Sequence, residues 1–391
     1  MKFYNFCAVV LAFAVTSCGS PIKKVIKDHV RVADVQVKAL AAASDNGTEV
    51  KIPHTFQNGK IKFVGKSAWT SGFFAGTLWE MYALTGDKTF ADYAKRQTDN
   101  LEEIKFLTSH HDIGFMMNSS FGGALEYAPD LVDQKAYKDV LIQSAKSLCT
   151  RFHPGAGIIQ SWNTSEKWLC PVIIDNMMNL ELLFKATQFS GDSTYWKVAV
   201  SHADKTLQNH FRPDYSTYHV VDYDPETGEI RAKQTAQGYG DETAWARGQS
   251  WGLYGFTMAY RFTKDQRYLD QAEHIANFLL TNKTMPEDLV PYWDFDCPDI
   301  PNTYREVTCA AIMASAFCEL YSITGKQLYL DSADKIITSL AKPEYRAAPG
   351  ENGNFILMHS CSTVPGKSEV DVPLNYADYY LLEALIRRQK L

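Results

Sequence analysis

The sequence is poor in residue patterns that hold metal ions. Its 391 residues include 8 cysteines and 10 histidines, but it has no Cys-x-x-Cys pair and no cysteine–histidine cluster with the spacing of a zinc site. Six scattered cysteines are expected to be small core side chains: Cys149, Cys170, Cys297, Cys309, Cys318 and Cys361. The sequence therefore predicts no metal centre and no cofactor.

A surplus of basic charge is also absent. The chain has 45 acidic residues against 39 lysines and arginines, which gives a formal net charge of −6. Proteins that bind nucleic acids or coat polyanions need a broad positive field, so this balance argues against both classes. It still allows a small anionic ligand in a local cationic pocket.

No apolar run after the first 17 residues approaches the ~18 residues that a membrane-spanning helix needs. The N-terminus itself has the parts of an export signal: Lys2, an apolar run over residues 6–15, and then Val15-Thr16-Ser17-Cys18. These last four residues resemble the lipobox of bacterial lipoproteins. Cleavage before Cys18 and acylation of its thiol would tether the mature chain by lipid.

The predicted domain order follows from this signal. Residues 1–17 are the signal peptide, residues 18–24 the lipidated cysteine with a short tether, and residues 25–391 one folded domain. We expect an exported, periplasmic lipoprotein that meets the membrane only through its anchor at Cys18. The alternative is a cleaved signal without lipid. The oligomeric state is not indicated.

A short pattern recurs along the rest of the chain. A turn, usually with glycine, is followed by an aromatic residue and, four residues later, by alanine; the copies cover residues 85–94, 190–199, 263–272 and 324–333, with a degenerate copy at 133–137. Each copy lies between two apolar helical runs. The pattern predicts a helix, a C-cap turn and an antiparallel helix whose first aromatic residue packs on its partner.

With a last helical segment near residues 381–386, the spacing predicts about six helical pairs. Such pairs either stack into an open solenoid or close into a ring, and closure is favoured because no copy has the polar face of a capping repeat. The predicted fold is all-α, an (α/α)6 barrel. Residues 218–223 and 229–233 flank a Pro-Glu-Thr-Gly turn and predict one small β-hairpin insertion.

Polar and aromatic residues gather where each helix of the predicted inner wall begins. The clusters cover residues 67–73, 110–115, 171–176, 240–251, 292–306 and 359–371. Inner helices of such a barrel run in one direction, so their N-termini meet at one rim and the six clusters converge on one cleft. The amide dipoles of these N-termini favour an anionic ligand.

Two aspartates in these clusters, Asp112 and Asp175, are candidates for acid–base chemistry. A residue before a helix is also a common N-cap, and Ser71, Asp112, Asp175 and Thr308 each fit that role. Either aspartate alone fits both interpretations. The two together, within six converging clusters, favour the catalytic one.

Five long motifs of this chain match those of a known enzyme family. They are Trp69-Thr70-Ser71-Gly72-Phe73, His111-Asp112-Ile113-Gly114-Phe115, Ile174-Asp175-Asn176-Met177-Met178-Asn179-Leu180, Trp245-Ala246-Arg247-Gly248-Gln249-Ser250-Trp251-Gly252 and Asp371-Val372-Pro373-Leu374-Asn375-Tyr376-Ala377-Asp378-Tyr379-Tyr380. In this order they resemble glycoside hydrolase family 88, the unsaturated glucuronyl hydrolases, over nearly the whole chain after about Val25. The resemblance implies an (α/α)6 barrel that removes the terminal 4,5-unsaturated uronic acid from lyase-generated glycosaminoglycan oligosaccharides.

The resemblance also implies roles for the matching residues. Asp175 would be the general acid and base, and Asp112 the second essential carboxylate. The implied substrate-binding residues are Trp69, Phe73, His111, His219, Gln237, Arg247, Trp251, His359, Ser362 and Lys367.

Some of these residues have more specific implied tasks. Trp69 and Trp251 would sandwich the terminal sugar, and Phe73 would lead toward the next sugar. Arg247 and the histidines would select the uronate carboxylate. The stretch from Ser362 to Ser368 partly resembles a segment that meets sulfate in some members, which implies tolerance of sulfated substrates. Residues 305–309 read Arg-Glu-Val-Thr-Cys where the family has an Arg-Asp-Ser-Ser-Ala-like run, so no ligand role is carried over to them.

The chemistry of such a substrate requires one neutral carboxylic acid. Its C4=C5 double bond beside the ring oxygen is a vinyl ether, which accepts a proton at C4 and leaves an oxocarbenium ion centred at C5. Water then adds at C5, and the hemiketal opens and expels the aglycone, unlike the usual displacement at the anomeric carbon. Asp175 lies between Ile174 and Met177 in an apolar stretch, which is expected to raise its pKa, and an anionic Asp112 nearby would raise it further.

Three other functions are left open. An unsaturated rhamnogalacturonyl hydrolase for pectic fragments shares the barrel and the chemistry, but the residues around Asp112 and Arg247 favour the glucuronyl group. A sugar epimerase or isomerase generally uses several facing histidines, whereas acids dominate here. A non-catalytic glycan-binding lipoprotein would keep the aromatic residues, 13% of the sequence, but has no need of two facing aspartates.

Overall fold

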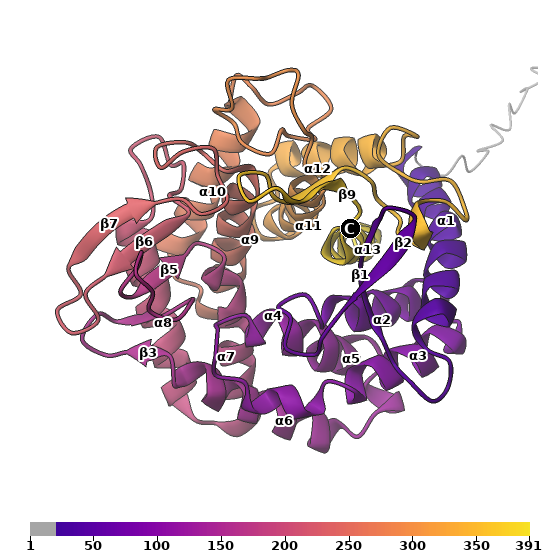
Figure 1. Cartoon of the computed structure of the whole chain (residues 1–391), viewed down its shortest axis with the longest axis horizontal. Coiled ribbons are helices and arrows are strands. Elements are labelled where there is room, and N and C mark those ends of the chain that lie inside the picture. Colours follow the sequence, from indigo (N-terminus) through magenta and orange to yellow (C-terminus); the bar gives the residue numbers. More distant parts are fainter. Residues whose placement is uncertain (1–20) are drawn as a thin grey trace, which may run out of the picture.

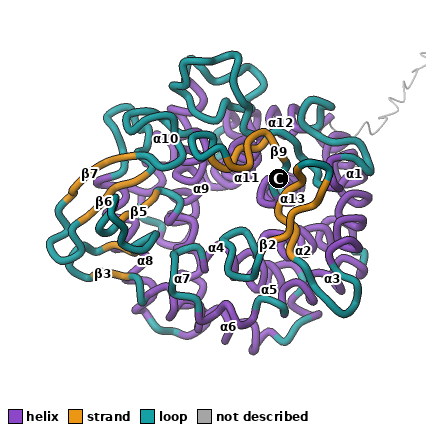
Figure 2. The backbone as a smooth tube through the Cα atoms, viewed as in Figure 1, coloured by secondary structure: helices purple, strands orange, loops and turns teal. Residues whose placement is uncertain are grey.

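The computed structural model describes residues 21–391, which form a ring of helices with the short strands in its connections (Figures 1 and 2). The expected signal peptide and Cys18 lie outside the described residues.

Six helical segments make the inner wall. They are α2 (Phe73–Thr85), a segment made of α4 (Ile113–Met117), a π-helical turn (Asn118–Gly122) and α5 (Gly123–Tyr127), then α7 (Asn176–Ser190), α9 (Ala246–Thr263), α11 (Val307–Thr324) and α13 (Asn375–Gln389). Each packs on the next, and α13 packs on α2. The ring is therefore closed, and the predicted (α/α)6 barrel is confirmed.

Six further helices lie outside this wall. Five follow an inner partner directly: α3 (Lys88–Asp99), α6 (Gln134–Cys149), α8 (Ser193–Asn209), α10 (Gln266–Thr281) and α12 (Gln327–Leu340). The sixth outer helix is α1 (Pro21–Ser44), which lies between α2 and α12. The His29 ring lies 2.9 Å from the carbonyl of Ile337, and the Gln36 amide donates to the carbonyl of Phe355. The helical pair expected near residues 381–386 is instead the single inner helix α13, and the sixth outer helix comes from the N-terminal end of the chain.

The recurring turns explain why each helical pair forms. The residue that ends the inner helix is left-handed in four of them: Gly86 (φ 71°), Gly191 (75°), Lys264 (58°) and Gly325 (68°). Glycine adopts this conformation without steric cost. Before four outer helices an aspartate accepts a hydrogen bond from a backbone N–H two or three residues later: Asp87, Asp133, Asp192 and Asp265. These side chains satisfy donors that a helix start leaves unpaired.

The strands are short and lie between the helical pairs. The predicted hairpin is confirmed as β6 (Val220–Tyr223) and β7 (Ile230–Gln234), and β5 (Pro171–Ile173) adds a third antiparallel strand. Three further hairpins were not predicted: β1 (Ile52–Gln57) with β2 (Lys60–Val64), β3 (Phe152–His153) with β4 (Ile158–Ile159), and β8 (Ser360–Thr363) with β9 (Ser368–Val372). Short 3-10 helices cover Glu102–Phe106, Pro129–Leu131 and Asn352–Asn354.

The inner helices are apolar nearly all round because both of their sides are covered. Within residues 21–391, α11 is the single helix long and apolar enough to cross a membrane, and 78% of it is buried inside the ring. A helix that packs on neighbours on every side has this composition. The six cysteines of the described chain are unpaired, and five of them are buried, as expected for core positions.

Candidate active site

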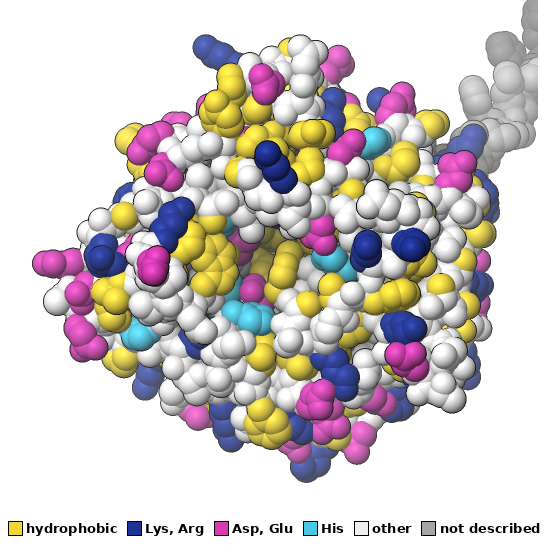
Figure 3. Space-filling model, in the orientation of Figure 1, with side chains coloured by type: hydrophobic (Ala, Val, Ile, Leu, Met, Phe, Trp, Pro, Cys, Tyr) yellow, Lys and Arg dark blue, Asp and Glu magenta, His cyan; other side chains and the backbone are white. Residues whose placement is uncertain are grey.

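A cavity opens at the centre of the ring, where inner helices begin. It is lined by Trp69, Asp112, Trp162, Ile173, Asp175, Gln237 and Arg247, and it encloses about 380 Å³ when its open mouth is counted. Figure 3 shows the hollow with hydrophobic, acidic and histidine side chains around it. Residues from the starts of α2, α4, α7 and α9 thus meet in one place, as the converging clusters predict.

The two aspartates of the cavity stand at N-cap positions but do not cap their helices. Asp112 precedes α4 and Asp175 precedes α7, and neither side chain accepts a bond from the following turn. Asp175 is 8% exposed, and its Oδ2 atom is buried without a hydrogen-bond partner among the described residues. The aspartates before four outer helices do cap. The capping interpretation is therefore wrong for Asp112 and Asp175.

Asp175 has the environment of a neutral acid. Burial raises its pKa to about 7, and the charge of Asp112 adds to this rise. The Arg247 guanidinium and the indole N–H of Trp251 act in the opposite direction. Loss of hydration destabilises the charged form of a carboxyl group relative to the neutral form. A large share of the protein molecules therefore has Asp175 protonated at neutral pH, as the apolar sequence around it predicts.

Asp112 has the opposite tendency. Burial raises its pKa, but two histidines outweigh that effect and hold the pKa below its usual value. Its Oδ1 atom lies 3.2 Å from Nε2 of His111, and its Oδ2 atom lies 3.1 Å from Nδ1 of His110. The cavity therefore pairs a proton donor with an anion, and this divergence of two pKa values is typical of acid–base sites.

A packing contact between α4 and α7 holds the two aspartates in a fixed relation. Asn179 on α7 accepts a hydrogen bond from the backbone N–H of Phe115 and donates to Nδ1 of buried His111. Gly114 makes the approach feasible, because a Cβ atom there would lie 2.5 Å from Cα of Asn179. The His111 ring consequently carries its hydrogen on Nε2, the atom that faces Asp112.

His219 faces Asp175 from the start of strand β6. Its Nδ1 atom accepts hydrogen bonds from the backbone N–H groups of Ala236 and Gln237, at 3.1 and 3.2 Å. The hydrogen is thus on Nε2, which lies 3.8 Å from Oδ2 of Asp175. Burial lowers the pKa of His219 well below its usual value, so the ring is neutral and its Nε2–H faces Asp175 from behind the cavity wall.

Arg247 is 1% exposed and is largely engaged within the protein. Its Nη1 group donates to Glu306 at 2.6 Å and to the carbonyl of Cys361, and its Nη2 group donates to Gln237 at 2.9 Å and to the carbonyl of Ser362 at 2.6 Å. Among the described residues, only its Nε–H lacks a partner. Glu306 thus neutralises Arg247, and selection of a uronate carboxylate by Arg247 stays a prediction.

The structure corrects two of the expected aromatic contacts. Trp69 lines the cavity, but Phe73 and Trp251 are completely buried and do not. Phe73 packs among the rings of the inner core, with Tyr379 at 5.3 Å between centroids. In this structure Phe73 therefore has no exposed face for a second sugar, and Trp251 has none for a sandwich with Trp69. Both of these predicted contacts are wrong in this structure.

Trp162 is the cavity aromatic that sequence reasoning missed. It lies in the loop between β4 and β5, and its ring is 5.4 Å from that of Trp168. Two tryptophans in a short polar loop were the available signal, since exposed aromatic residues on loops often contact ligands. Ile173, at the end of β5, was missed as well.

The remaining predicted residues lie beside the cavity and do not line it. His359 precedes β8, and its Nδ1 atom lies 2.6 Å from Oδ1 of Asp371. Ser362 is on β8 and meets the site through its carbonyl bond to Arg247. Lys367 is exposed in the turn between β8 and β9, with a φ of 52°. This hairpin therefore borders the site next to Arg247.

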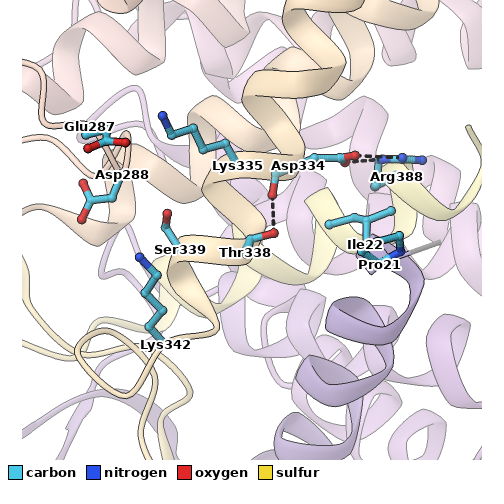
Figure 4. A pocket seen from close by; sticks show the side chains of 10 residues that line it. All are labelled: Pro21, Ile22, Glu287, Asp288, Asp334, Lys335, Thr338, Ser339, Lys342 and Arg388. Carbon is cyan, nitrogen blue, oxygen red and sulfur yellow. Dashed lines mark hydrogen bonds and ion pairs between the residues drawn. The ribbon is translucent and has the colours of Figure 1, made fainter.

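A larger cavity elsewhere has a different character (Figure 4). It lies between α12, the first residues of α1 and the end of α13. Arg388 in its wall is bonded to Asp334, and the Thr338 hydroxyl donates to the Asp334 carbonyl. Because α13 begins at the central cavity and rises about 1.5 Å per residue over 15 residues, this second cavity is about 20 Å away. Its wall is aliphatic and charged, without the facing donor and anion of the central cavity.

Comparison with known proteins agrees with this geometry. The model of the family described as Glycosyl Hydrolase Family 88 matches residues 44–387. An unsaturated glucuronyl hydrolase from Formosa agariphila is 46% identical over 324 residues, which are 83% of this chain and 80% of that protein. An unsaturated chondroitin disaccharide hydrolase from Streptococcus agalactiae is 33% identical over 353 residues, 88% of this chain and 87% of that protein.

A solved structure is similar over almost the full length. A crystal structure of an unsaturated glucuronyl hydrolase specific for heparin superposes with a TM-score of 0.90 and 41% identity. The superposition covers 94% of this chain and 98% of that one. The likeness extends to the whole ring and its connections.

Proposed function

The chain belongs to glycoside hydrolase family 88, and we propose that its central cavity binds the unsaturated uronic acid at the end of a lyase-cut glycosaminoglycan oligosaccharide, with Asp175 as proton donor. Its activity is that of an unsaturated glucuronyl hydrolase. The observation that carries the residue assignment is that Asp175 and Asp112 line one cavity, where burial raises the pKa of Asp175 and two histidines lower the pKa of Asp112.

In this proposal Asp175 transfers its proton to C4 of the vinyl ether, and positive charge develops at C5 and the ring oxygen. Asp112 stabilises that charge as an anion. The Asp175 carboxylate then takes a proton from the water that adds at C5, which restores the acid. The hemiketal at C5 opens and releases the aglycone, so the net change is the addition of one water molecule. Binding of a sugar oxygen by His219, which lies 3.8 Å from Asp175, stays a prediction.

We propose heparin-type disaccharides as preferred substrates. The likeness to the heparin-specific enzyme, at 41% identity, supports this choice over chondroitin disaccharides, whose hydrolase in Streptococcus agalactiae is 33% identical. Ser362 and Lys367, on the hairpin beside Arg247, are the side chains proposed to tolerate sulfate on the second sugar.

The test is incubation with lyase-generated disaccharides while the ultraviolet absorbance of the conjugated double bond is followed. We expect the absorbance to fall with heparin and chondroitin disaccharides, and faster with the former. A fall with pectic disaccharides alone would instead assign the pectic activity, and constant absorbance with every substrate would contradict the proposal. Faster turnover of chondroitin disaccharides would refute the heparin preference only.

Activity should be lost as pH rises through about 7. The folded protein retains the Asp175 proton up to a pKa of about 7, whereas an ordinary aspartate loses it near 3.8. Because the reaction needs the protonated form, kcat/KM should be constant at mildly acidic pH and then fall about tenfold per pH unit. A pH–rate profile that stays flat to about pH 9 would contradict this assignment.

We also propose that the chain is exported and tethered by lipid at Cys18, on the strength of the N-terminal motif. Cells that produce the full chain should incorporate labelled palmitate into it, and a Cys18→Ala chain should not. Equal labelling of both chains would exclude the anchor.

A further inference from the structure

Two histidines precede Asp112, and the reaction described above gives no task to either of them. His110 is a partly exposed residue at the edge of the site. Its Nε2 atom lies 3.1 Å from the carbonyl oxygen of Ser67, and its Nδ1 atom lies 3.1 Å from Oδ2 of Asp112. The ring therefore spans from the loop that carries Trp69 to the carboxylate at the start of α4.

These two contacts define where the hydrogens of the ring are. A backbone carbonyl can only accept a hydrogen bond, so Nε2 of His110 carries a hydrogen. At Nδ1, a neutral ring would turn a lone pair toward an ionised carboxylate oxygen 3.1 Å away. The backbone N–H of Asp112 donates to Nδ1 at 3.2 Å when the ring is neutral. Protonation of Nδ1 gives up that bond in exchange for a bond between an imidazolium and a carboxylate, which is roughly twice as strong as a neutral one. Both ring nitrogens are then protonated.

We propose that His110 is a positioning residue of this enzyme: as an imidazolium fixed by Ser67, it keeps Asp112 ionised and sets the orientation of its carboxylate in the cavity. The proposal rests on the proposed function, because Asp112 matters only if the cavity is the active site. His110 acts through Asp112 and need not touch the substrate.

The charged surroundings of His110 are consistent with this state. The groups that face it are Asp112 and, as weaker influences, His111 and Arg151. Burial and the Arg151 charge lower the pKa of His110, but the bond to Asp112 outweighs them and the pKa is raised. Arg151 itself is held away by its bonds to the carbonyls of Thr108 and Gln160, both at 2.7 Å.

The influence of His110 extends to the proton donor. The negative charge of Asp112 is one cause of the raised pKa of Asp175. Loss of the His110 cation would allow Asp112 to take up a proton at higher pH, and a neutral Asp112 no longer supports a protonated Asp175. The bond to Ser67 also links Asp112 to the segment that carries Trp69, so His110 connects two parts of the cavity wall.

A direct test follows the ring itself. In the full mature chain with ¹³Cε1-labelled histidine, the His110 signal, assigned by its absence in His110→Gln, should titrate above pH 6.5, the ordinary value for histidine. In Asp112→Asn the midpoint should fall by about one pH unit or more. A wild-type midpoint at or below 6.5, or one that Asp112→Asn leaves unchanged, would overturn the proposal whether or not the enzyme turns over the substrate.

Kinetics test the positioning role. His110→Gln should lower kcat about tenfold or more with little change in KM, and it should move the acidic limb of the pH–rate profile up by about one unit. His274 lies on outer helix α10, and its ring stacks on the ring of Tyr215. His274→Gln is therefore the matched control and should behave as wild type. A normal kcat and pH profile in His110→Gln would refute the role. Absence of activity in the wild-type chain would instead refute the proposed function, and the titration would still be informative.

Discussion

An Asp175→Asn variant should fold like the wild-type protein and lose most of its turnover. The amide has nearly the same shape but has no carboxylic proton to transfer to C4 of the sugar. General acid–base catalysis contributes roughly 10²–10⁴-fold, so kcat should fall by that factor while KM changes little. The Oδ2 atom of Asp175 has no hydrogen-bond partner among residues 21–391, so the substitution breaks no bond at that atom.

The measurement compares kcat, from the loss of double-bond absorbance, with the thermal unfolding midpoint. Asp192→Asn is a matched control: Asp192 also precedes a helix but caps it through the N–H of Thr194, and asparagine is an equally good cap. It should retain full activity. If Asp175→Asn kept near-wild-type kcat, the proton donor would have to be another residue.

An Arg247→Ala variant should be strongly destabilised as well as inactive. Arg247 and Glu306 are both buried, at 1% exposure each, with 2.6 Å between Nη1 and Oε2. Removal of one partner of a buried ion pair leaves an unpaired charge and typically costs about 3–5 kcal/mol. The carbonyls of Cys361 and Ser362 would lose their donor too, so the β8–β9 hairpin should loosen beside the cavity.

Chemical unfolding of the purified protein checks this. Arg267 is the control, because its ion pair with Asp265 joins two side chains that are 56% and 31% exposed, and such surface pairs contribute at most about 1 kcal/mol. A double variant, Arg247→Met with Glu306→Gln, should recover some of the lost stability because it removes both charges. If Arg247→Ala unfolded at the same denaturant concentration as Arg267→Ala, the structural role of the pair would be disproved.

The Arg247–Glu306 pair shows what Glu306 does in the segment that departs from the family pattern, residues 305–309. Glu306 has two tasks: it binds Arg247 and it caps α11 through the N–H of Thr308. A residue that keeps an arginine in place has no need to touch the substrate. The sequence gives no ligand role to this segment, and its contacts assign it a supporting position behind the cavity.

The helical pairs could be predicted because their causes are local. A left-handed glycine such as Gly86 and an aspartate cap such as Asp87 act within a few residues, so the repeated turns indicate each pair without knowledge of its neighbours. The (α/α)6 ring then follows from the number of pairs. The place of α1 between α2 and α12 could not be predicted from spacing, because it brings the N-terminal helix against a helix near the other end of the chain.

The candidate site also has features with local causes and features that depend on distant segments. The sequence alone determined which segments converge, since all inner helices of such a ring start at one rim, and its apolar stretch around Asp175 was enough to indicate a raised pKa. Only the tertiary structure decided which side chains face the cavity. Phe73 and Trp251 are buried while Trp162 is not, because exposure depends on what distant helices and loops pack against each ring. For the same reason the protonation states around Asp112 depend on His110 and on the carbonyl of Ser67, a contact between segments 43 residues apart.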